Sequence, residues 1–302
     1  MQITERRIPS SDGEHELYCR VYAPDGEIKG LFHVAHGMTE HIRRDGYDTF
    51  MRVMAENGYL CFGYDHLGHG LTVKDESELG YVGDWQFLVK DVQNVSKLMK
   101  KEYGESLPCF LLGHSMGSFI CRCAANPRIW DKAVFMGTGG PIAGSKLALK
   151  LIRSKIKKNG GHAVSPEITK LIFGSYCKRF KDENDRISWL SSKKDVREAY
   201  RIDSLCGFSF TLNGYYALIR LQSLCNSNMW FKRLSSDLPV LLVSGSEDPV
   251  GNYGKGVEKV NKSLIKNSKN VQMKLYEGCR HEILNDVCRE EVINDILAFI
   301  EN

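Results

Sequence analysis

Short apolar runs bounded by glycine or proline alternate along this chain with longer stretches of helical periodicity. This alternation is typical of βα units stacked on a mostly parallel sheet. The apolar runs predict eight strands, at 3–8, 16–22, 30–35, 60–64, 109–112, 133–136, 240–243 and 271–276. The longer stretches predict helices at 47–57, 85–101, 115–125, 254–266 and 286–300. We therefore expect an α/β protein with a doubly wound sheet, an antiparallel hairpin at its start, and functional loops at the carboxyl ends of its strands.

One long segment interrupts this alternation. Between Gly140 and Leu238 the helical periodicity continues without a run typical of a buried strand, and the βα pattern resumes at Pro239. We therefore expect a helical cap at residues 141–238, inserted between the sixth and seventh strands of a core formed by residues 1–140 and 239–302. Its helices are expected at 146–158, 166–180, 193–201 and 214–224.

Composition and charge narrow the class of function. The 302 residues are 42% hydrophobic and 26% charged, as expected of a folded protein with a large core. The net charge of +4 is too small to predict binding to nucleic acid. Residues 1–9 lack the apolar stretch of a secretion signal, and no run reaches the roughly 18 apolar residues of a membrane span. The ten cysteines are scattered and several lie in apolar segments, so without an export signal we expect reduced buried thiols and a cytoplasmic protein. They form no C-x-x-C pair, so we expect no structural zinc.

Residues 113–117 read Gly-His-Ser-Met-Gly, a G-x-S-x-G motif between a predicted strand and a predicted helix. In a nucleophile elbow, a sharp strand-to-helix turn exposes the serine oxygen to a base and to backbone amides. The crowded turn requires small residues two positions either side of the serine, here Gly113 and Gly117. Ordinary turns also contain this motif, so Ser115 is a candidate nucleophile that needs partners elsewhere in the chain.

A serine nucleophile requires a histidine as base and a carboxylate that holds the tautomer of that histidine. In sheets that carry this elbow, the acid and then the base follow the serine along the chain. Two histidines follow Ser115: His162 in the expected cap, and His281 between the last predicted strand and the last helix. We predict His281 as the base because its loop lies at the carboxyl ends of the strands. Asp248 is the predicted acid because its short side chain suits a loop tip, and Glu247 is the alternative.

Two backbone amides are expected to form an oxyanion hole for the developing negative charge. One belongs to Met116, directly after the serine, and the other to Met38, in the loop after the third strand. Gly37 permits the sharp turn that this second amide requires. We expect the neighbouring His36 to be a local structural residue.

A second histidine-rich loop, residues 65–70, follows the fourth predicted strand. Asp65, His66 and His69 could hold a metal ion, but the glycines between them break a helical spacing and no further ligand cluster accompanies them. We expect these side chains to brace the neighbouring loops, and we expect neither a metal nor an organic cofactor.

Five motifs together resemble those of a known family: HGMTEH at 36–41, DHLGHG at 65–70, GHSMG at 113–117, GSEDPV at 245–250 and GCRHEILND at 278–286. Their order is similar to that in the monoacylglycerol lipase and lysophospholipase group of α/β-hydrolases, which is grouped with serine aminopeptidase S33-type hydrolases. The resemblance covers nearly the whole chain. Leu67 stands where the family usually has arginine, and the stretch between His41 and Tyr47 is longer than usual.

The resemblance implies an α/β-hydrolase fold with a lid over an acyl pocket. It also implies the same site residues: a triad of Ser115, Asp248 and His281, with the amides of Met38 and Met116 as the oxyanion hole. The expected function is hydrolysis of carboxylic esters of single-chain lipids, such as monoacylglycerols or lysophospholipids, or of related acyl esters. We expect a small-molecule acyl ester as substrate, and the cap candidates for its pocket are Phe208 and Tyr215. Most apolar residues of the cap are expected to form its own core, but some must face the acyl chain, and the possible walls are Leu147, Leu151, Ile152, Leu171, Ile172, Phe173, Phe208, Phe210, Tyr215, Tyr216, Leu218 and Ile219.

Two other functions remain open at this stage. An amidase or aminopeptidase on the same fold would need an acidic anchor for a substrate amine, for which Glu183, Asp185 and Asp203 are candidates. A non-catalytic binding module would lack a member of the triad, whereas all three candidates are present here.

The cap also carries a basic run in its first expected helix. Such a run is usually a solvated helix face, but it could also draw the cap to anionic lipid as a peripheral membrane contact. Its members are Lys146, Lys150, Arg153, Lys155, Lys157 and Lys158.

Overall fold

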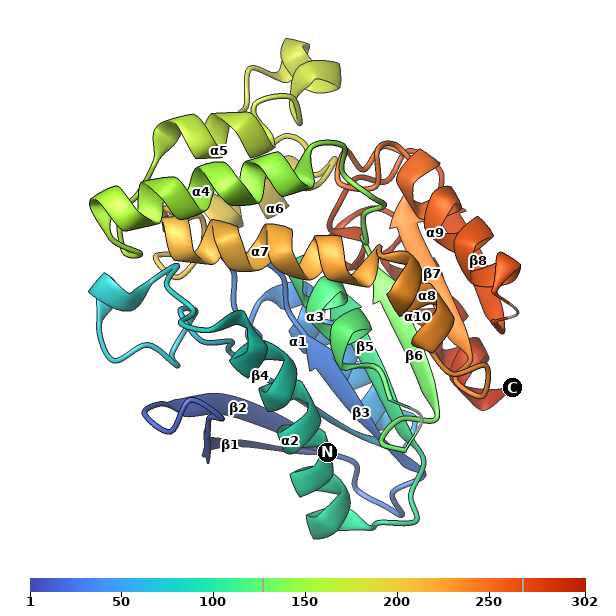
Figure 1. Cartoon of the computed structure of the whole chain (residues 1–302). Coiled ribbons are helices and arrows are strands. Elements are labelled where there is room, and N and C mark those ends of the chain that lie inside the picture. The colour runs from blue at the N-terminus through green and yellow to red at the C-terminus, as the bar shows by residue number, and fades with distance from the viewer. Residues whose placement is uncertain (127, 268) are drawn as a thin grey trace.

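An eight-stranded sheet forms the centre of the computed structural model, which describes residues 1–126, 128–267 and 269–302 (Figure 1). The strand order is β1-β2-β4-β3-β5-β6-β7-β8. β1 pairs antiparallel with β2 and β2 antiparallel with β4, and all later pairs are parallel. The strands are β1 (Gln2–Pro9), β2 (Glu16–Ala23), β3 (Gly30–Ala35), β4 (Tyr59–Tyr64), β5 (Cys109–His114), β6 (Lys132–Met136), β7 (Val240–Gly245) and β8 (Val271–Tyr276).

The central strands have continuous apolar sequences because helices cover both faces of the sheet. β3, β4, β5 and β7 are buried at every position, as expected for parallel strands covered on both sides. One face packs against α1 (Asp45–Glu56) and α10 (Arg289–Glu301). The other packs against α2 (Trp85–Tyr103), α3 (Met116–Ala124) and α9 (Lys255–Lys266). The prediction of an α/β-hydrolase fold with a mostly parallel sheet is confirmed, and each predicted strand agrees with the observed one within two residues at either end.

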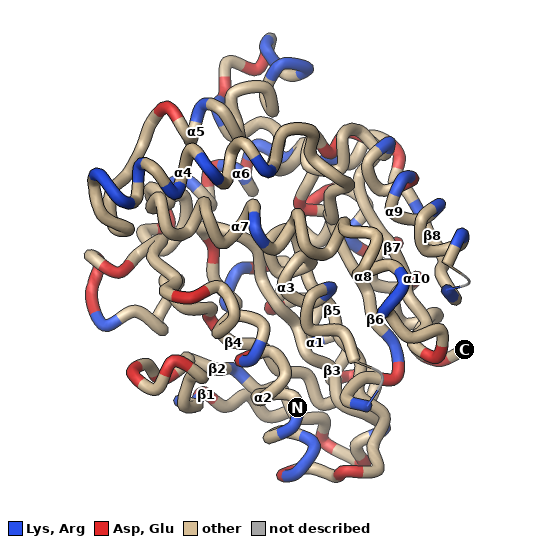
Figure 2. Tube along the Cα trace, in the orientation of Figure 1, with Lys and Arg blue, Asp and Glu red and all other residues tan. Residues whose placement is uncertain are grey.

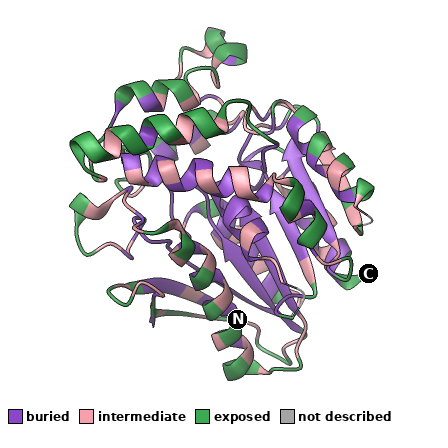
Figure 3. Ribbon diagram, in the orientation of Figure 1, coloured by how far each residue is buried: buried purple, intermediate pink, exposed green. Residues whose placement is uncertain are grey.

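The segment between β6 and β7 is helical and lies over the carboxyl ends of the strands (Figure 1). It contains α4 (Ser145–Asn159), α5 (Pro166–Phe173), α6 (Lys194–Ile202), α7 (Leu212–Cys225) and α8 (Asn228–Arg233). α7 is largely buried and packs on α3, whereas the outer faces of α4 and α5 are exposed (Figure 3). The exact division into a core and a cap of residues 141–238 stays a prediction.

Three short 3-10 helices complete the described elements: η1 (Glu76–Glu78), η2 (Lys178–Glu183) and η3 (Ile283–Asn285). The helix predicted at 166–180 was too long, because α5 ends before Gly174 and the chain continues into η2. The last predicted helix, 286–300, instead begins at Arg289, and η3 precedes it. In the described part of the chain, no helix is long and apolar enough to cross a membrane.

Arg122, on the helix that follows Ser115, contacts the start of the helical segment and the end of α7. Its guanidinium is fully buried and donates hydrogen bonds to the Thr138 hydroxyl (3.1 Å) and the Gly139 carbonyl (3.2 Å), where the chain leaves β6. It also donates to the Cys225 carbonyl and the Asn226 side chain (3.1 Å), at the end of α7. Burial lowers the pKa of Arg122, and the carbonyls at a helix carboxyl end offset part of that cost. The single side chain therefore fixes where the segment leaves the core and where α7 ends.

Two cysteines differ from the expectation of reduced thiols. A disulfide joins Cys279 to Cys288, whose Cα atoms lie 6.6 Å apart, while the other eight cysteines are free. The expectation was wrong for this pair because nothing in a spacing of nine residues indicates that the chain folds back there. The loop between them contains η3 and returns to the start of α10.

Candidate active site

Ser115 occupies a strained turn between β5 and α3. Its backbone has φ 52° and ψ −119°, a conformation that costs a non-glycine residue free energy and persists only when its surroundings enforce it. Main-chain crowding explains the flanking glycines: a Cβ at Gly113 would lie 2.4 Å from the Gly117 oxygen, and one at Gly117 would lie 2.4 Å from the Ala35 oxygen. The Ser115 amide donates to the Met136 carbonyl at 2.9 Å. The turn therefore has the geometry of a nucleophile elbow.

His281 and Asp248 form a buried pair at the carboxyl ends of β8 and β7. His281 Nδ1 donates to Asp248 Oδ2 at 2.9 Å, and this carboxylate also accepts from the Ser244 hydroxyl (3.2 Å) and the Val250 amide (2.8 Å). Because Nδ1 carries the proton, Nε2 has the free lone pair. That atom is buried and has no hydrogen-bond partner among the described residues, and both His281 and Ser115 line one cavity.

The structure does not bring the alternative residues, Glu247 and His162, to the pair of His281 and Asp248. The Glu247 side chain is 35% exposed, and one of its carboxylate oxygens lies 3.4 Å from Arg179. His162 stacks on Tyr81 with ring centroids 3.7 Å apart, in the helical segment. The geometry thus brings together His281 and Asp248, and leaves Glu247 and His162 outside the site.

The loop after β3 lies directly beside Ser115. A Cβ at Gly37 would be 3.1 Å from the Ser115 Cβ, and the Gly37 amide donates to Glu40 Oε1 at 2.6 Å, which fixes the loop. Among the described residues, the amides of Met38 and Met116 have no acceptor in the chain. Two N–H groups on the loops that flank the serine are therefore available to an oxyanion.

A buried ion cluster ties this loop to the loop of His281. Arg44 Nη1 lies 2.5 Å from Glu40 Oε2 and 2.5 Å from Glu282 Oε1, and Nη2 lies 2.8 Å from Glu282 Oε2. All three side chains are at most 7% exposed. Burial opposes ionisation of Glu40, yet the hydrogen bond from His114 and the positive charge of Arg44 hold its pKa well below the ordinary value. A guanidinium between two carboxylates therefore fixes the loops on both sides of the serine.

His114 extends this cluster to the candidate base. Its Nδ1 lies 2.7 Å from the Tyr47 hydroxyl and 3.3 Å from Glu40 Oε1, and its Nε2 donates to the His281 carbonyl at 3.2 Å. Burial would lower the pKa of His114, but the bond to Glu40 raises it. Sequence reasoning missed this cluster, although Glu40, His114 and Glu282 all lie inside motifs that carry the predicted site residues.

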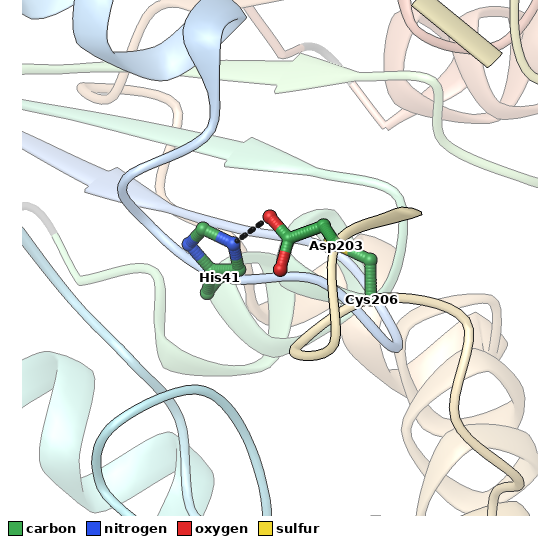
Figure 4. A group of neighbouring side chains, drawn as sticks. All are labelled: His41, Asp203 and Cys206. Atoms are coloured by element: carbon green, nitrogen blue, oxygen red, sulfur yellow. Dashed lines mark hydrogen bonds and ion pairs between the residues drawn. The ribbon is translucent and has the colours of Figure 1, made fainter. Parts of the chain in front are cut away.

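The helical segment contacts the same loops at two places. Figure 4 shows His41, Asp203 and Cys206, whose potential ligand atoms lie within 4.8 Å of one another. His41 Nδ1 accepts from the Arg43 amide (3.2 Å), so Nε2 carries the proton that it donates to Asp203 (2.8 Å). A metal at Nε2 would have to displace this proton. The observed hydrogen bond itself joins the loop after β3 to the segment after α6.

The second contact reaches His281 itself. The carbonyl of Trp189 accepts from the His281 amide (3.3 Å), and the carbonyl of Leu190 accepts from the Glu282 amide (2.7 Å). The Trp189 and His281 ring centroids are 5.0 Å apart. Trp189 also escaped prediction, although it is an isolated aromatic residue in a polar stretch.

The cavity above Ser115 has a volume of about 550 Å³ and is lined mainly by apolar side chains. Its apolar walls include Leu147, Leu151, Leu171, Phe173, Tyr176, Trp189, Leu218 and Ile219. The candidates Phe208 and Tyr215 were wrong, because neither is among the residues that line it. Tyr215 is buried and bonds the Thr169 hydroxyl (2.9 Å), and Phe208 packs edge-on against His69. This volume is suited to a small molecule such as a single acyl chain.

The loop after β4 braces the site, as expected. Asp65 accepts from the amides of Ile42 (2.8 Å) and Leu71 (2.7 Å), while His66 donates through its amide to His36 Nε2 (3.0 Å). His36 itself donates to the Gly37 carbonyl at 2.8 Å, which is a structural contact.

Because four histidines are buried, we expect the folded protein to lose stability in mild acid. Burial lowers the pKa of His33 and His36 to about 3 and of His69 to about 4, and it lowers that of His66 well below the ordinary value. Unfolded histidines titrate near pH 6.5, so below that pH the unfolded chain binds protons that the folded chain rejects. The contribution of these residues is fully present above pH 6.5 and falls by about 1.4 kcal/mol per histidine per pH unit below it.

We therefore expect the free energy of unfolding, measured in urea between pH 5 and 7.5, to fall steeply below pH 6.5. His33→Leu should reduce the slope by about one proton, whatever it does to the stability at pH 7. A slope unchanged by His33→Leu would contradict the assignment.

The sequence and fold of this chain are similar to those of known hydrolases. A family model described as serine aminopeptidase, S33, matches residues 26–287. The monoglyceride lipase of Mus musculus is 30% identical over 280 residues, which cover 91% of this chain and 82% of that protein. The Rattus norvegicus protein is 39% identical, but over 121 residues that span 38% of its length.

Among solved structures, a thermostable carboxyl esterase from Bacillus coagulans, in complex with glycerol, superposes with a TM-score of 0.93 at 28% identity. The superposition covers 100% of this chain and 98% of that one. Monoglyceride lipase from Saccharomyces cerevisiae, in complex with a substrate analog, shares the fold with a TM-score of 0.74 at 19% identity, over 95% and 91% of the two chains.

Proposed function

This chain belongs to the serine aminopeptidase S33 family of α/β-hydrolases, and from that membership we propose that Ser115, His281 and Asp248 hydrolyse esters of single-chain lipids. It is a carboxylic ester hydrolase of the monoglyceride lipase type. The observation that carries the mechanism is the buried His281 Nε2, which has no partner in the described chain and shares a cavity with Ser115. A non-catalytic binding module would have no need of a histidine held in this tautomer.

The mechanism follows from these positions. His281 Nε2 takes the Ser115 proton as the serine oxygen attacks the ester carbonyl, and Asp248 stabilises the resulting imidazolium through Nδ1. The amides of Met38 and Met116 hold the negative oxygen. His281 then gives its proton to the leaving alcohol, and water releases the fatty acid from the acyl-enzyme by the same steps in reverse.

Asp248 and its neighbour provide a matched test of this mechanism. Asp248→Asn should lower kcat on the order of 10⁴-fold, because the amide no longer favours the tautomer with a free Nε2. Glu247→Gln should stay within about threefold of the unmodified protein, because Glu247 makes an exposed ion pair. Ester turnover and fluorophosphonate labelling of Ser115 measure the effect, with Ser115→Ala as the unlabelled control. The reverse order, an inactive Glu247→Gln and an active Asp248→Asn, would exclude the proposed triad.

The cavity favours a neutral head group over a phosphate. Among the described residues that line it there is no lysine or arginine, while Glu40 and Glu282 both contribute to its wall. A phosphate bound there would be a buried anion without a cation to pair with. The proposed substrate is therefore a monoacylglycerol or a similar neutral ester rather than an anionic lysophospholipid.

Two substrates that differ only in the phosphate test this preference. In mixed micelles of neutral detergent, kcat/KM for 1-oleoylglycerol should exceed that for 1-oleoylglycerol 3-phosphate on the order of 100-fold, the cost of an unpaired buried charge. Comparable values for the two esters would show that the phosphate finds a partner that the structure does not provide.

The three carboxylates that could anchor a substrate amine in an aminopeptidase already have partners in the chain. Glu183 pairs with Arg280 and Arg197, Asp185 pairs with Arg197 and Arg201, and Asp203 accepts from His41. None of these carboxylates is among the cavity-lining residues. A substrate amine would therefore find no free acid from this group, which favours esters over aminoacyl amides.

The outer surface of the helical segment fits a peripheral contact with lipid. Leu147 is 72% exposed, Leu171 63% and Ile142 48%, and all three line the cavity that contains Ser115. Lys146 and Lys150 are exposed beside them, and Figure 2 shows the basic residues along α4. An apolar rim flanked by lysines is suited to an anionic lipid surface, from which a substrate would enter the cavity.

Vesicle sedimentation tests this contact. Replacing both Leu147 and Leu171 by serine should weaken binding to vesicles of phosphatidylcholine and phosphatidylglycerol by about tenfold or more, since two exposed apolar side chains leave the lipid. Met229→Ser, at a residue 59% exposed on α8, is the matched control and should bind as before. Equal weakening by both variants, or binding that does not depend on anionic lipid, would exclude the proposed surface.

A further inference from the structure

The cavity contains a cluster of three aromatic side chains beside the candidate base. Trp189 contacts His281, and its ring lies 5.1 Å from that of Tyr176 at 74° and 6.1 Å from that of Phe173 at 19°. All three line the cavity and are only partly buried. The cluster thus offers unsaturated surface to whatever occupies the cavity next to His281.

The chemistry of the reaction decides which part of a substrate meets this cluster. His281 gives its proton to the leaving alcohol, so the alcohol oxygen lies within hydrogen-bond reach of Nε2 at that step. The group attached to that oxygen therefore passes beside the His281 ring, on which Trp189 packs. The acyl chain extends from the carbonyl in another direction.

The remaining walls suit that acyl chain. α4 and α7 pack side by side and contribute aliphatic side chains to the cavity, among them Leu147, Leu151, Leu218 and Ile219. Aliphatic walls accept a flexible chain through area burial alone, whereas aromatic rings also favour offset or edge-to-face contacts with another ring. The aliphatic wall formed by α4 and α7 thus comes from a different part of the helical segment than the aromatic cluster.

We propose that Phe173, Tyr176 and Trp189 form the subsite for the leaving alcohol, and that this subsite selects acyl esters whose alcohol carries an aromatic ring. The proposal rests on ester hydrolysis by Ser115 and His281 as described above. Trp189 is its central residue, because it alone of the three contacts His281 in the described chain. Aromatic contacts of this kind favour a ring over a saturated group by about three- to tenfold.

Two octanoate esters of nearly equal size test the proposal: the benzyl ester and the cyclohexylmethyl ester. Each kcat/KM is divided by the rate constant for hydrolysis of the same ester by hydroxide, which corrects for the intrinsic reactivity of the ester. The ratio of the corrected values, benzyl over cyclohexylmethyl, should be about three to ten. Trp189→Leu should bring this ratio close to one even if both rates fall, and Trp189→Phe should retain most of it. Trp85→Leu, the same change in a groove away from the cavity, should leave the ratio unchanged.

Inhibition by the free alcohols provides a second measurement that does not need turnover of an ester. Benzyl alcohol should inhibit octanoylglycerol hydrolysis more strongly than cyclohexylmethanol, and the difference should disappear in Trp189→Leu. A ratio near one in the unmodified protein, or a ratio that survives Trp189→Leu, would overturn the aromatic subsite. If neither ester nor any monoacylglycerol were hydrolysed, the proposed ester hydrolysis itself would fail, which is a distinct result.

Discussion

The position of Arg44 between Glu40 and Glu282 is the interaction on which the site depends. Glu40 lies 4 residues from Arg44 along the chain and Glu282 lies 238 residues from it, yet both carboxylates contact the Arg44 guanidinium. Glu40 also accepts from the Gly37 amide, so it fixes the loop that carries the candidate oxyanion amide of Met38, while Glu282 directly follows His281. Because loss of one partner would leave a buried charge unpaired, the cluster strongly resists separation of the two loops. The strained turn at Ser115 thus lies between loops that cannot move apart independently.

Two parts of the helical segment between β6 and β7 contact this site in different ways. Residues around Trp189 and Leu190 bond the main chain of the His281 loop, and Arg280 reaches back to the Ser188 carbonyl at 2.6 Å. α4 and α5 bury one residue each, Ile152 and Ile168. One part of the segment therefore supports His281, and another part forms the outer wall of the cavity.

The strands could be predicted closely because parallel strands covered on both faces have uninterrupted apolar sequences. Ser115, Asp248 and His281 could be chosen because each follows a strand, and the carboxyl ends of parallel strands meet at one edge. The walls of the cavity could be predicted only in part: Leu147, Leu151, Leu171, Ile172, Phe173, Leu218 and Ile219 were among the possible walls, but the pattern did not separate them from the core of the cap. α7 is buried on most of its surface, so its pattern did not show that Leu218 faces the cavity while Tyr215 faces away. The ion cluster joins residues too distant in sequence for a local pattern to pair them.

The contacts of Arg122 also define which parts of this protein can be exchanged. Its acceptors are the Gly139 and Cys225 carbonyls and two neutral side chains, so it recognises the path of the backbone at the start of the segment and at the end of α7 more than the amino-acid sequence there. Helices α4 to α6 lie between these points, and the exposed outer faces of α4 and α5 are the parts most free to diverge during evolution. A chimaera that received this segment from a relative would have to keep residues 138–139 and 225–226 to retain the junction. A replacement segment would also have to keep the contacts to the loops of His41 and His281, because the segment and the core are joined there as well as at Arg122.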